Sequence, residues 1–404
     1  MIQSYKKIEF LEQIAILENC ISRNFKLQSE LEARGFDRDS LIYRHNCSIA
    51  PNFSIYKTPD NYQFKTSEIP VVSFFSGAGG LDLGFKYAGF EHLASVEINP
   101  IFCQTLRKNF ANSVILGPPE CSGDLRDRDE IINILKSKIG INFPFEGVFF
   151  GGPPCQSFSI AANQRFSKAG ENFKRTGFLQ AEYGNLLFEF VWYICEFKPR
   201  VFLIENVSGL LSVDGGKQIN AALEMLENKG YTVTEPTVLN AADYGVPQNR
   251  SRLFLCGWRT PAKFNFPEAE PLKVPCYKAL EKPLINVENH ITRQHKAESI
   301  MRYIELKYGE RDRLGRVDRL DPNLPAKTVI AGGSKGGGRS HLHPLIPRTL
   351  SVRESARLQT FPDSFIFCGC PARQFTQVGN AVPPLLALKL ARAISTKIYG
   401  IKSE

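Results

Sequence analysis

Residues 151–155, with the sequence Gly-Gly-Pro-Pro-Cys, place a cysteine in a setting that favours chemistry over packing. They directly follow the apolar run Val-Phe-Phe at 148–150, which is typical of a buried strand. A nucleophilic thiolate needs exposure together with nearby positive charge or helix dipoles. Two prolines stiffen the backbone here, so we expect Cys155 to be presented at the strand end as a reactive group.

An acid and two arginines stand beside other predicted strands. Glu205 ends one apolar run, and Arg250 and Arg252 lie at the start of another. The carboxyl ends of strands face the ligand crevice in open α/β sheets. A buried, protonated acid can hydrogen-bond N3 of a pyrimidine, and an arginine can hold its O2 carbonyl. Taken alone, Cys155 fits a buried, inert thiol, Glu205 fits a helix cap, and the two arginines fit surface charges. Taken together, they predict addition of the Cys155 thiolate to C6 of a pyrimidine ring. The ring carbon C5 then becomes nucleophilic and can accept a methyl group from a sulfonium cofactor.

A glycine-rich turn joins a predicted strand to a helix within residues 71–85. Gly77, Gly79 and Gly80 permit a tight turn and the close approach of a ligand. Glu97 lies 20 residues after Gly77, where an acid that ends the next strand can bind ribose hydroxyls. The spacing matches neither the dinucleotide motif nor a P-loop. We interpret the turn as a nucleoside site, and the alternative is a structural turn beside an exposed acid.

Alternating elements indicate how these groups are positioned. Helical patterns lie at 186–197 and 216–230. Short apolar, β-rich runs lie at 69–75, 93–98, 146–150, 200–205 and 252–258. Strands that alternate with helices predict an α/β fold with a doubly wound, mostly parallel sheet.

Composition narrows the class of protein without deciding it. The 404 residues carry a formal net charge of +9 and a pI near 9.0, which suits a polyanionic partner but also an ordinary basic protein. The 10 cysteines are scattered without a Cys-x-x-Cys pair, as expected for free thiols in a reducing cytoplasm. Cys368 and Cys370 with His341 and His343 do not have the spacing of a zinc site, so no metal is predicted. No apolar run is long enough to span a membrane.

The motifs, taken in order, resemble those of the DNA (cytosine-5)-methyltransferases of prokaryotic restriction–modification systems. The resemblance covers about residues 69–396. The matching stretches are FSGAGGLDLGF, VEINP, GDL, GGPPCQSFS, GNLLFEF, IENV, YGVPQNRSR, RESARLQTFP and QVGNAVPP. The resemblance implies a catalytic domain with a Rossmann-like fold, S-adenosylmethionine as the cofactor, and a smaller, irregular target recognition domain.

The resemblance also implies a division of the chain. Residues 1–67 are expected to be an N-terminal helical extension and linker, and 68–260 the catalytic and cofactor-binding domain. Residues 261–375 are expected to be the target recognition domain, and 376–404 a segment that returns to the catalytic domain. A packing role is favoured for the extension, while a dimer contact or a regulatory DNA-binding piece stays open.

Roles for single residues follow from the resemblance. It implies that Cys155 attacks C6 of a flipped cytosine, Glu205 holds the N3/N4 edge, Arg252 lies near O2 and Arg250 supports it. Cofactor contacts are expected from Phe75, Gly77, Gly79, Leu81, Glu97, Ile98, Asp124, Leu186, Asn380 and Val382. Ile98 packs on the adenine in this view, and Asp124 meets its amino group.

Duplex DNA is the expected partner, and the reacting base has to leave the stack. DNA contacts are expected from Gln156, Ser159, Thr328, Lys335 and Arg339, although the glycine-rich stretch that holds the last two also fits a solvated loop. A monomer acting in the cytoplasm on nucleoid DNA, with a cognate restriction endonuclease for the same site, completes this expectation.

Three rival functions are compatible with part of the same residues. An RNA-modifying relative that acts on tRNA shares the fold, but the chain lacks the Cys-Phe-Thr tripeptide associated with that branch. A non-catalytic DNA-binding regulator fits the N-terminal extension, but Cys155, Glu205 and Arg252 are all retained. A nicotinamide dehydrogenase explains Gly77 and Glu97 but leaves the Pro-Pro-Cys motif unexplained.

Overall fold

The computed structural model describes residues 6–154, 186–282, 284, 286–315, 317–331 and 341–401, without the side chains at 213 and 214. The chain forms two compact units, and each is made of several segments. The sheet unit consists of Thr58–Tyr244, Ser251–Glu270 and Ala381–Glu404. The loop-rich unit consists of Met1–Lys57, Gly245–Arg250 and Pro271–Asn380.

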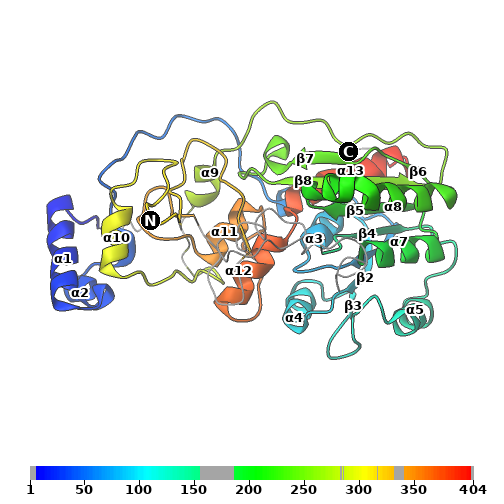
Figure 1. Ribbon diagram of the computed structural model, residues 1–404, viewed down its shortest axis with the longest axis horizontal. Coiled ribbons are helices and arrows are strands. Elements are labelled where there is room, and N and C mark those ends of the chain that lie inside the picture. The colour runs from blue at the N-terminus through cyan, green and yellow to red at the C-terminus, as the bar shows by residue number, and fades with distance from the viewer. Residues whose placement is uncertain are drawn as a thin grey trace. The chain divides into compact units, whose positions relative to one another are not determined.

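One eight-stranded sheet organises the described part of the sheet unit (Figure 1). Its path runs β3-β2-β1-β4-β5-β8-β6, and β7 also pairs with β8. The strands are β1 (Pro70–Phe74), β2 (Glu91–Val96), β3 (Val114–Leu116), β4 (Val148–Gly151), β5 (Val201–Asn206), β6 (Thr232–Val233), β7 (Thr237–Asn240) and β8 (Ser251–Trp258). Strands β3 to β5 along this path are parallel, whereas β8 runs antiparallel to β5, β6 and β7. The predicted α/β class with a mostly parallel sheet is confirmed.

Helices of the sheet unit cover the strands and complete its core. They are α3 (Gly80–Tyr87), α4 (Pro100–Asn109), α5 (Arg128–Ser137), α7 (Leu186–Phe197), α8 (Lys217–Asn228) and α13 (Pro384–Lys397). Side chains of α5, α7 and α8 pack with the strands in one apolar cluster. In that cluster the Phe74 ring lies 4.9 Å from Phe149 and 5.0 Å from Phe190, measured between centroids. This packing fixes the strand ends that carry the candidate site.

The C-terminal helix α13 packs directly against α3. A Cβ added at Gly84 would lie 2.4 Å from Ala387 Cβ and 2.5 Å from Leu388 N. The two backbones therefore approach so closely that a side chain at this position would force them apart. Residues 381–404 thus belong to the sheet unit although they come last in the sequence. In the part of the chain that is described, no helix has the length and apolar character needed to cross a membrane.

The loop-rich unit has short helices and few regular strand pairs among its described residues. Its helices are α1 (Phe10–Arg23), α2 (Leu27–Ala33), α9 (Cys276–Leu280), α10 (Ala297–Tyr303), α11 (Val352–Leu358) and α12 (Pro371–Asn380). Side chains of α1 and α2 share an apolar cluster with α10, and Figure 1 shows these three helices together. The sequence predicted a helical extension and linker over 1–67 and favoured a packing role for it. Residues 1–57 group with 271–380 in this unit. The reason is that the apolar faces of α1 and α2 are covered by α10.

Candidate active site

The glycine-rich turn after β1 has a backbone that demands its glycines. Gly77 and Gly79 have φ angles of 57° and 84°, and α3 starts at the next residue. Phe75 also has a positive φ of 53°, which is uncommon for a side chain of this size. A Cβ at Gly79 would lie 2.7 Å from the Phe110 ring, and one at Gly80 would lie 2.3 Å from Val382 O. The turn therefore holds its shape through close contacts that only glycine permits.

Glu97 directly follows β2 and reaches back to this turn. Its Oε2 accepts a hydrogen bond from Gly77 N at 2.8 Å, and its Oε1 accepts one from Asn99 N at 2.7 Å. Burial raises the pKa of Glu97, and the two backbone N–H groups oppose that rise by stabilising the carboxylate. Each carboxylate oxygen keeps acceptor capacity beyond one bond. The acid is thus placed and oriented to bind hydroxyl groups of a ligand.

Two glycines that the sequence reasoning did not single out hold the backbone of Glu97. A Cβ at Gly117 would lie 2.0 Å from Glu97 O, and one at Gly123 would lie 2.3 Å from the same atom. Cys103 Sγ donates to that carbonyl at 3.1 Å. The Gly-Asp-Leu motif contains Gly123 beside Asp124 and could have pointed to a role for this glycine. No motif in the sequence pointed to Gly117.

Asp124 lies on the loop that follows β3, with its carboxylate already engaged. Arg126 Nη2 donates to Asp124 Oδ2 at 2.6 Å, and Arg126 N donates to Oδ1 at 3.0 Å. The hydrogen bonds from Arg126 hold the pKa of Asp124 below its ordinary value. Helix α7, which starts at Leu186, is tied to this loop because Tyr193 Oη donates to Leu125 O at 3.0 Å.

The other expected cofactor residues are divided between the two units. Ile98 follows Glu97 and is 54% exposed, so its apolar surface is open to a ligand. Leu81, Leu186 and Val382 are buried in the sheet unit, and the Phe75 ring packs 6.2 Å from Phe190 on α7. Asn380 ends α12 and is exposed on the loop-rich unit.

Glu205 and Arg252 form an ion pair at the ends of β5 and β8. Arg252 Nε lies 3.0 Å from Glu205 Oε1, and the two side chains are 17% and 12% exposed. Burial lowers the pKa of Arg252 and the Glu205 charge opposes this, yet a guanidinium stays charged in proteins. Since β8 runs antiparallel to β5, its first residues come beside the last residues of β5. The sequence predicted that both residues serve one site, but it did not predict this direct contact.

The segment before Cys155 lies against the same acid. A Cβ at Gly152 would lie 2.7 Å from Glu205 Oε2, so glycine leaves room for the carboxylate. Asn206 Nδ2 donates to Pro153 O at 3.3 Å. Cys155 is the next residue after Pro154, but it lies outside the described residues, as do Gln156, Ser159, Lys335 and Arg339.

Arg250 is anchored inside the loop-rich unit. Its Nη1 donates to Val329 O at 3.2 Å and its Nη2 donates to Gly379 O at 2.7 Å. The neighbouring Gln248 is also buried, and its Oε1 accepts from Val329 N at 2.8 Å. Thr328 Oγ1 donates to Asn249 O at 2.7 Å. These contacts hold residues 245–250 firmly, and Gln248 was missed by the sequence reasoning although it starts the Gln-Asn-Arg-Ser-Arg motif.

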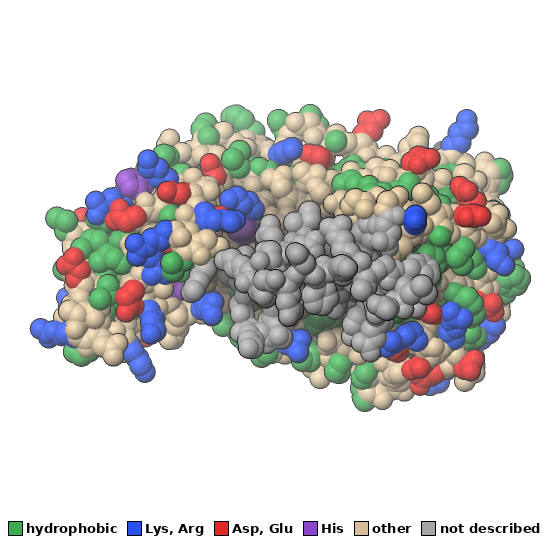
Figure 2. Space-filling view, viewed as in Figure 1, with side chains coloured by type: hydrophobic (Ala, Val, Ile, Leu, Met, Phe, Trp, Pro, Cys, Tyr) green, Lys and Arg blue, Asp and Glu red, His purple; other side chains and the backbone are tan. Residues whose placement is uncertain are grey.

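Surface charge is mixed on the visible face of the described residues. Figure 2 shows Lys and Arg side chains interspersed with Asp and Glu over both units. Among the described residues, no cluster of three His, Cys, Asp or Glu side chains is arranged to hold a metal ion.

Comparisons with known proteins agree with this geometry. The family model of the C-5 cytosine-specific DNA methylases matches residues 69–396. The type II methyltransferase M1.HphI of Haemophilus parahaemolyticus is 35% identical over 356 residues, which span 82% of this chain and 88% of the relative. The type II methyltransferase M.NgoFVII of Neisseria gonorrhoeae is 31% identical, over 84% of this chain and 89% of the relative.

Solved structures share the fold as well. One is a protein encoded within an Escherichia coli prophage and described as a DNA modification methyltransferase; it matches with a TM-score of 0.64 and 26% identity, over 82% of this chain and 100% of its own. Spodoptera frugiperda DNMT2 matches with a TM-score of 0.56 at 15% identity, over 81% of this chain and 99% of its own. The second likeness is one of fold.

Fold and site together define an S-adenosylmethionine-dependent methyltransferase. The buried Glu97 carboxylate beside the glycine turn and the exposed apolar side chain of Ile98 are groups that suit a nucleoside-bearing cofactor of this kind. The chain belongs to the C-5 cytosine-specific DNA methylases, and it is a DNA cytosine-5-methyltransferase of the type II restriction–modification kind. The predictions of family, enzyme class and cofactor are confirmed.

Proposed function

We propose that this enzyme methylates C5 of a cytosine that is extruded from a short, specific DNA sequence, through a covalent bond between Cys155 Sγ and C6. The observation that carries this proposal is the Glu205–Arg252 ion pair beside Gly152–Pro154. An acid and a guanidinium meet at the strand end where the next residue is the candidate nucleophile. That arrangement supplies the hydrogen-bonding groups that addition to a pyrimidine requires.

The chemical steps follow from these groups. The Cys155 thiolate attacks C6 while Glu205, which must be protonated when the base is bound, gives its proton to N3. The electron pair of the C5–C6 double bond moves to C4–C5, which makes C5 nucleophilic. Arg252 stabilises the charge that develops on O2. When bound, S-adenosylmethionine supplies an electrophilic methyl group on a sulfonium. Loss of the C5 proton to a base, departure of the Cys155 thiolate and return of the N3 proton to Glu205 then restore the aromatic ring.

The cofactor contacts are proposed by position. Glu97 binds the ribose hydroxyls, Ile98 covers one face of the adenine and Asp124 accepts from its amino group. The backbone of the turn lies against the methionine part. The remaining contacts are assigned to Phe75, Gly77, Gly79, Leu81, Leu186, Asn380 and Val382. Support comes from the placement of the sheet-unit members after β1, β2 and β3 and on the helices that follow.

DNA recognition is assigned to the loop-rich unit. Extrusion of the base is needed because C5 is stacked inside a duplex. Thr328, with its hydroxyl on Asn249 O, borders the anchored segment 245–250, which leads to Arg252. Gln156, Ser159, Lys335 and Arg339 are proposed DNA contacts from sequence alone. Arg250 is proposed to support Arg252 by fixing the backbone that precedes it.

The biological role is proposed from the relatives, which are named type II methyltransferases. In this role the enzyme protects host DNA from a cognate restriction endonuclease that cuts the same site. It acts as a monomer in the cytoplasm on nucleoid DNA.

Methyl transfer from labelled S-adenosylmethionine to unmethylated plasmid DNA tests the activity, and cytosine-resolved sequencing of the product reads the target. We expect conversion-resistant cytosines at one short motif. The matched control is a Cys155→Ser variant, which should bind the cofactor but methylate no cytosine. Labelling of tRNA instead of DNA, or of neither by a cofactor-binding preparation, would overturn the proposal.

A further inference from the structure

The N-terminal residues 6–57 are built into the core of the loop-rich unit. Seven of their apolar side chains share a buried cluster with residues of α10 and its neighbours; they are Ile8, Ile16, Leu17, Cys20, Leu27, Leu31 and Leu41. Backbone pairing continues this contact, since Arg44 N donates to Ile304 O at 2.8 Å. The segment therefore has no separate core, and its apolar faces are covered only by packing within this unit.

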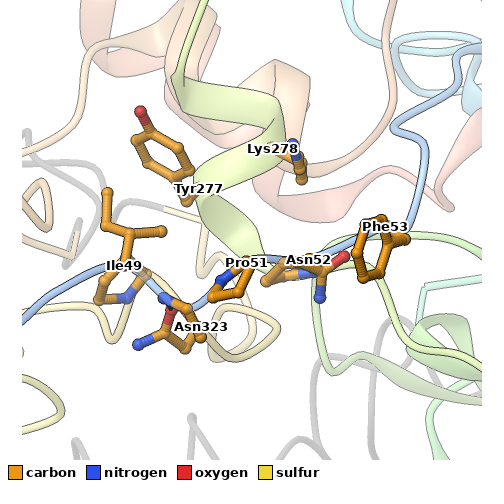
Figure 3. A pocket seen from close by; sticks show the side chains of 10 residues that line it. Ile49, Pro51, Asn52, Phe53, Tyr277, Lys278 and Asn323 are labelled. Atoms are coloured by element: carbon orange, nitrogen blue, oxygen red, sulfur yellow. Dashed lines mark hydrogen bonds between the residues drawn. The ribbon is translucent and has the colours of Figure 1, made fainter.

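A buried arginine fastens the next part of the segment. Arg319 Nη1 donates to His45 O at 2.5 Å, and its Nη2 donates to Asn46 Oδ1 at 2.7 Å. Its guanidinium lies 3.5 Å from the Tyr43 ring centroid and 4.0 Å from that of Tyr308. Further along, residues 49–53 run past α9 and line a pocket with Tyr277 and Lys278 (Figure 3). Two hydrogen bonds hold this last part: Ala50 N donates to Asn323 Oδ1 at 2.8 Å, and Tyr56 Oη donates to Arg357 O at 2.9 Å.

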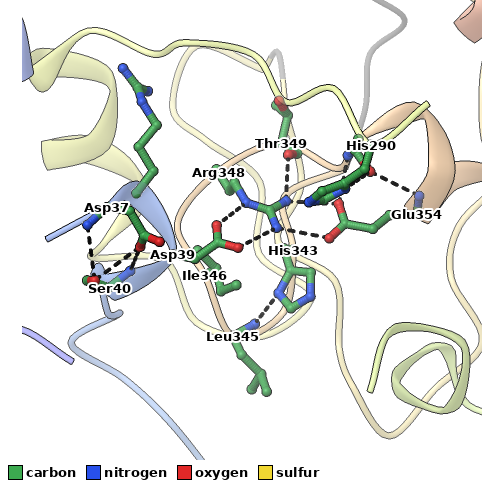
Figure 4. Close-up of polar contacts among 12 residues, drawn as sticks. Asp37, Asp39, Ser40, His290, His343, Leu345, Ile346, Arg348, Thr349 and Glu354 are labelled. Carbon is green, nitrogen blue, oxygen red and sulfur yellow. Dashed lines mark hydrogen bonds and ion pairs between the residues drawn. The ribbon is translucent and has the colours of Figure 1, made fainter. Parts of the chain in front are cut away.

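An ion network joins the segment to helix α11. Arg348 Nε lies 2.7 Å from Asp39 Oδ1, and Arg348 Nη1 lies 2.8 Å from Glu354 Oε2 (Figure 4). The side chains of Arg348 and Glu354 are 3% and 4% exposed, and that of Asp39 is 19% exposed. Glu354 also accepts from Ser351 N at 2.7 Å, which fixes the first turn of α11. One guanidinium therefore clamps an N-terminal carboxylate to the carboxylate that orients this helix.

Helix α11 in turn touches the segment that precedes Arg252. Gln359, which caps its C-terminal end, accepts at Oε1 from Gln248 Nε2 at 3.0 Å and donates to Val378 O at 2.7 Å. Gln248 belongs to the anchored residues 245–250. Contacts within one unit thus run from Asp39 through α11 to the side chain of Gln248, two residues before Arg250.

The charge of residues 6–57 argues against direct DNA binding by this segment. Residues 6–57 hold eight Lys and Arg against seven Asp and Glu, so their net charge is near zero. A separate DNA-binding arm would need a basic surface. Positioning of the recognition unit explains the buried Asp39–Arg348 contact, whereas an independent arm does not.

We propose that residues 6–57 are a constituent of the DNA recognition unit, and that Asp39 is a positioning residue which sets α11 for DNA recognition through Arg348. This inference rests on the proposed role of the loop-rich unit in binding DNA. It assigns the segment to the recognition step and leaves the cofactor site of the sheet unit independent of it.

Asp39→Asn tests the inference against Glu18→Gln, which removes the same charge from an exposed position on α1. Loss of one negative charge should strengthen phosphate binding slightly in both variants. We expect Asp39→Asn to act in the opposite direction and to raise the KM for cognate duplex DNA about tenfold, with unchanged cofactor Kd. Asp39→Glu, which keeps the charge, should restore much of the loss. Equal KM values for Asp39→Asn and Glu18→Gln would overturn the inference.

Hydrogen exchange on the wild-type enzyme gives a second test that does not depend on how the variant folds. Amides of α1 and α11 should exchange through one common opening, because the segment that contains α1 is joined to α11 through Asp39, Arg348 and Glu354. Much faster exchange in α1 than in α11 would show an independent arm and overturn the inference. A wild-type enzyme that binds cofactor but methylates no DNA would instead overturn the proposed function itself.

Discussion

Two buried glutamates, one in each unit, are held in opposite ways. Glu97 in the sheet unit is held by the backbone N–H groups of Gly77 and Asn99, and burial raises its pKa. Burial would also raise the pKa of Glu354 in the loop-rich unit, but the charge and hydrogen bonds of Arg348 hold it far below its ordinary value. Glu354 is paired with a buried guanidinium, whereas the partners of Glu97 among the described residues are neutral backbone N–H groups. The difference teaches that a buried acid is suited to ligand binding when its charge has no cationic partner in the protein.

Glu205 stands between these two cases, and its replacement should have the largest effect. It pairs with Arg252 like a structural acid, yet it lies at the strand end beside Gly152. Because Glu205→Gln removes a proton donor to the base, we expect the single-turnover methylation rate to fall by about 10²- to 10⁴-fold. Cofactor Kd, measured by calorimetry, should stay near the wild-type value. A rate within threefold of wild type would mean that Glu205 is only a structural partner of Arg252.

Arg348→Met tests the structural role of the buried pair between Arg348 and Glu354. It leaves Glu354 buried without its guanidinium, which costs about 3–5 kcal/mol of the free energy of unfolding for a buried pair. Denaturant unfolding measures this loss. Arg44→Met is the matched control, because its ion pair with Glu305 is largely exposed and is worth at most about 1 kcal/mol. Similar losses in both variants would contradict the assigned role of Arg348.

Glu97→Gln should affect ligand binding and spare stability. The amide keeps the shape but offers fewer acceptors to ribose hydroxyls, so we expect the cofactor Kd to rise about tenfold, or about 1.4 kcal/mol. Glu91→Gln, at the exposed start of the same strand, is the control and should leave Kd unchanged. A drop in thermal stability with unchanged Kd would place Glu97 with Glu354 as a structural acid.

The pH dependence of cofactor affinity and of stability should distinguish Glu97 from Glu354, with a smaller effect than the substitutions above. The raised pKa of Glu97 means that its carboxylate gains a proton at a higher pH than an ordinary glutamate of pKa 4.5, so cofactor affinity should weaken as pH falls toward that raised value. Glu97→Gln should flatten this dependence. Glu354 has a depressed folded pKa, so its stabilisation is present above its unfolded pKa and is lost only as pH falls through the folded value. Cofactor affinity of the wild type that is constant down to pH 4 would contradict the role of Glu97.

The sequence was informative where local rules decide the structure. Alternating strands and helices predicted the α/β class, and the turn at Gly77 with Glu97 was placed correctly, because glycine needs and strand ends follow from nearby residues. The antiparallel direction of β8 depends on its pairing with β5, from which it is separated by α8 and two short strands, so nearby residues do not decide it. Asp39 and Arg348 are 309 positions apart, so nothing local pointed to their contact. The burial of Arg250 against Val329 and Gly379 could not be predicted either, because these partners are also distant in the sequence.

The roles of the individual site residues stay predictions until they are measured, and Cys155 is the most important of them. A duplex that carries 5-fluorocytosine at the target position tests it most directly. Methyl transfer to this base leaves fluorine at C5 in place of the proton, so β-elimination is blocked and the Cys155–C6 bond persists. We predict a denaturation-resistant protein–DNA adduct that requires S-adenosylmethionine and is absent for Cys155→Ser. Absence of any adduct from enzyme that methylates the unmodified duplex would contradict covalent catalysis by Cys155.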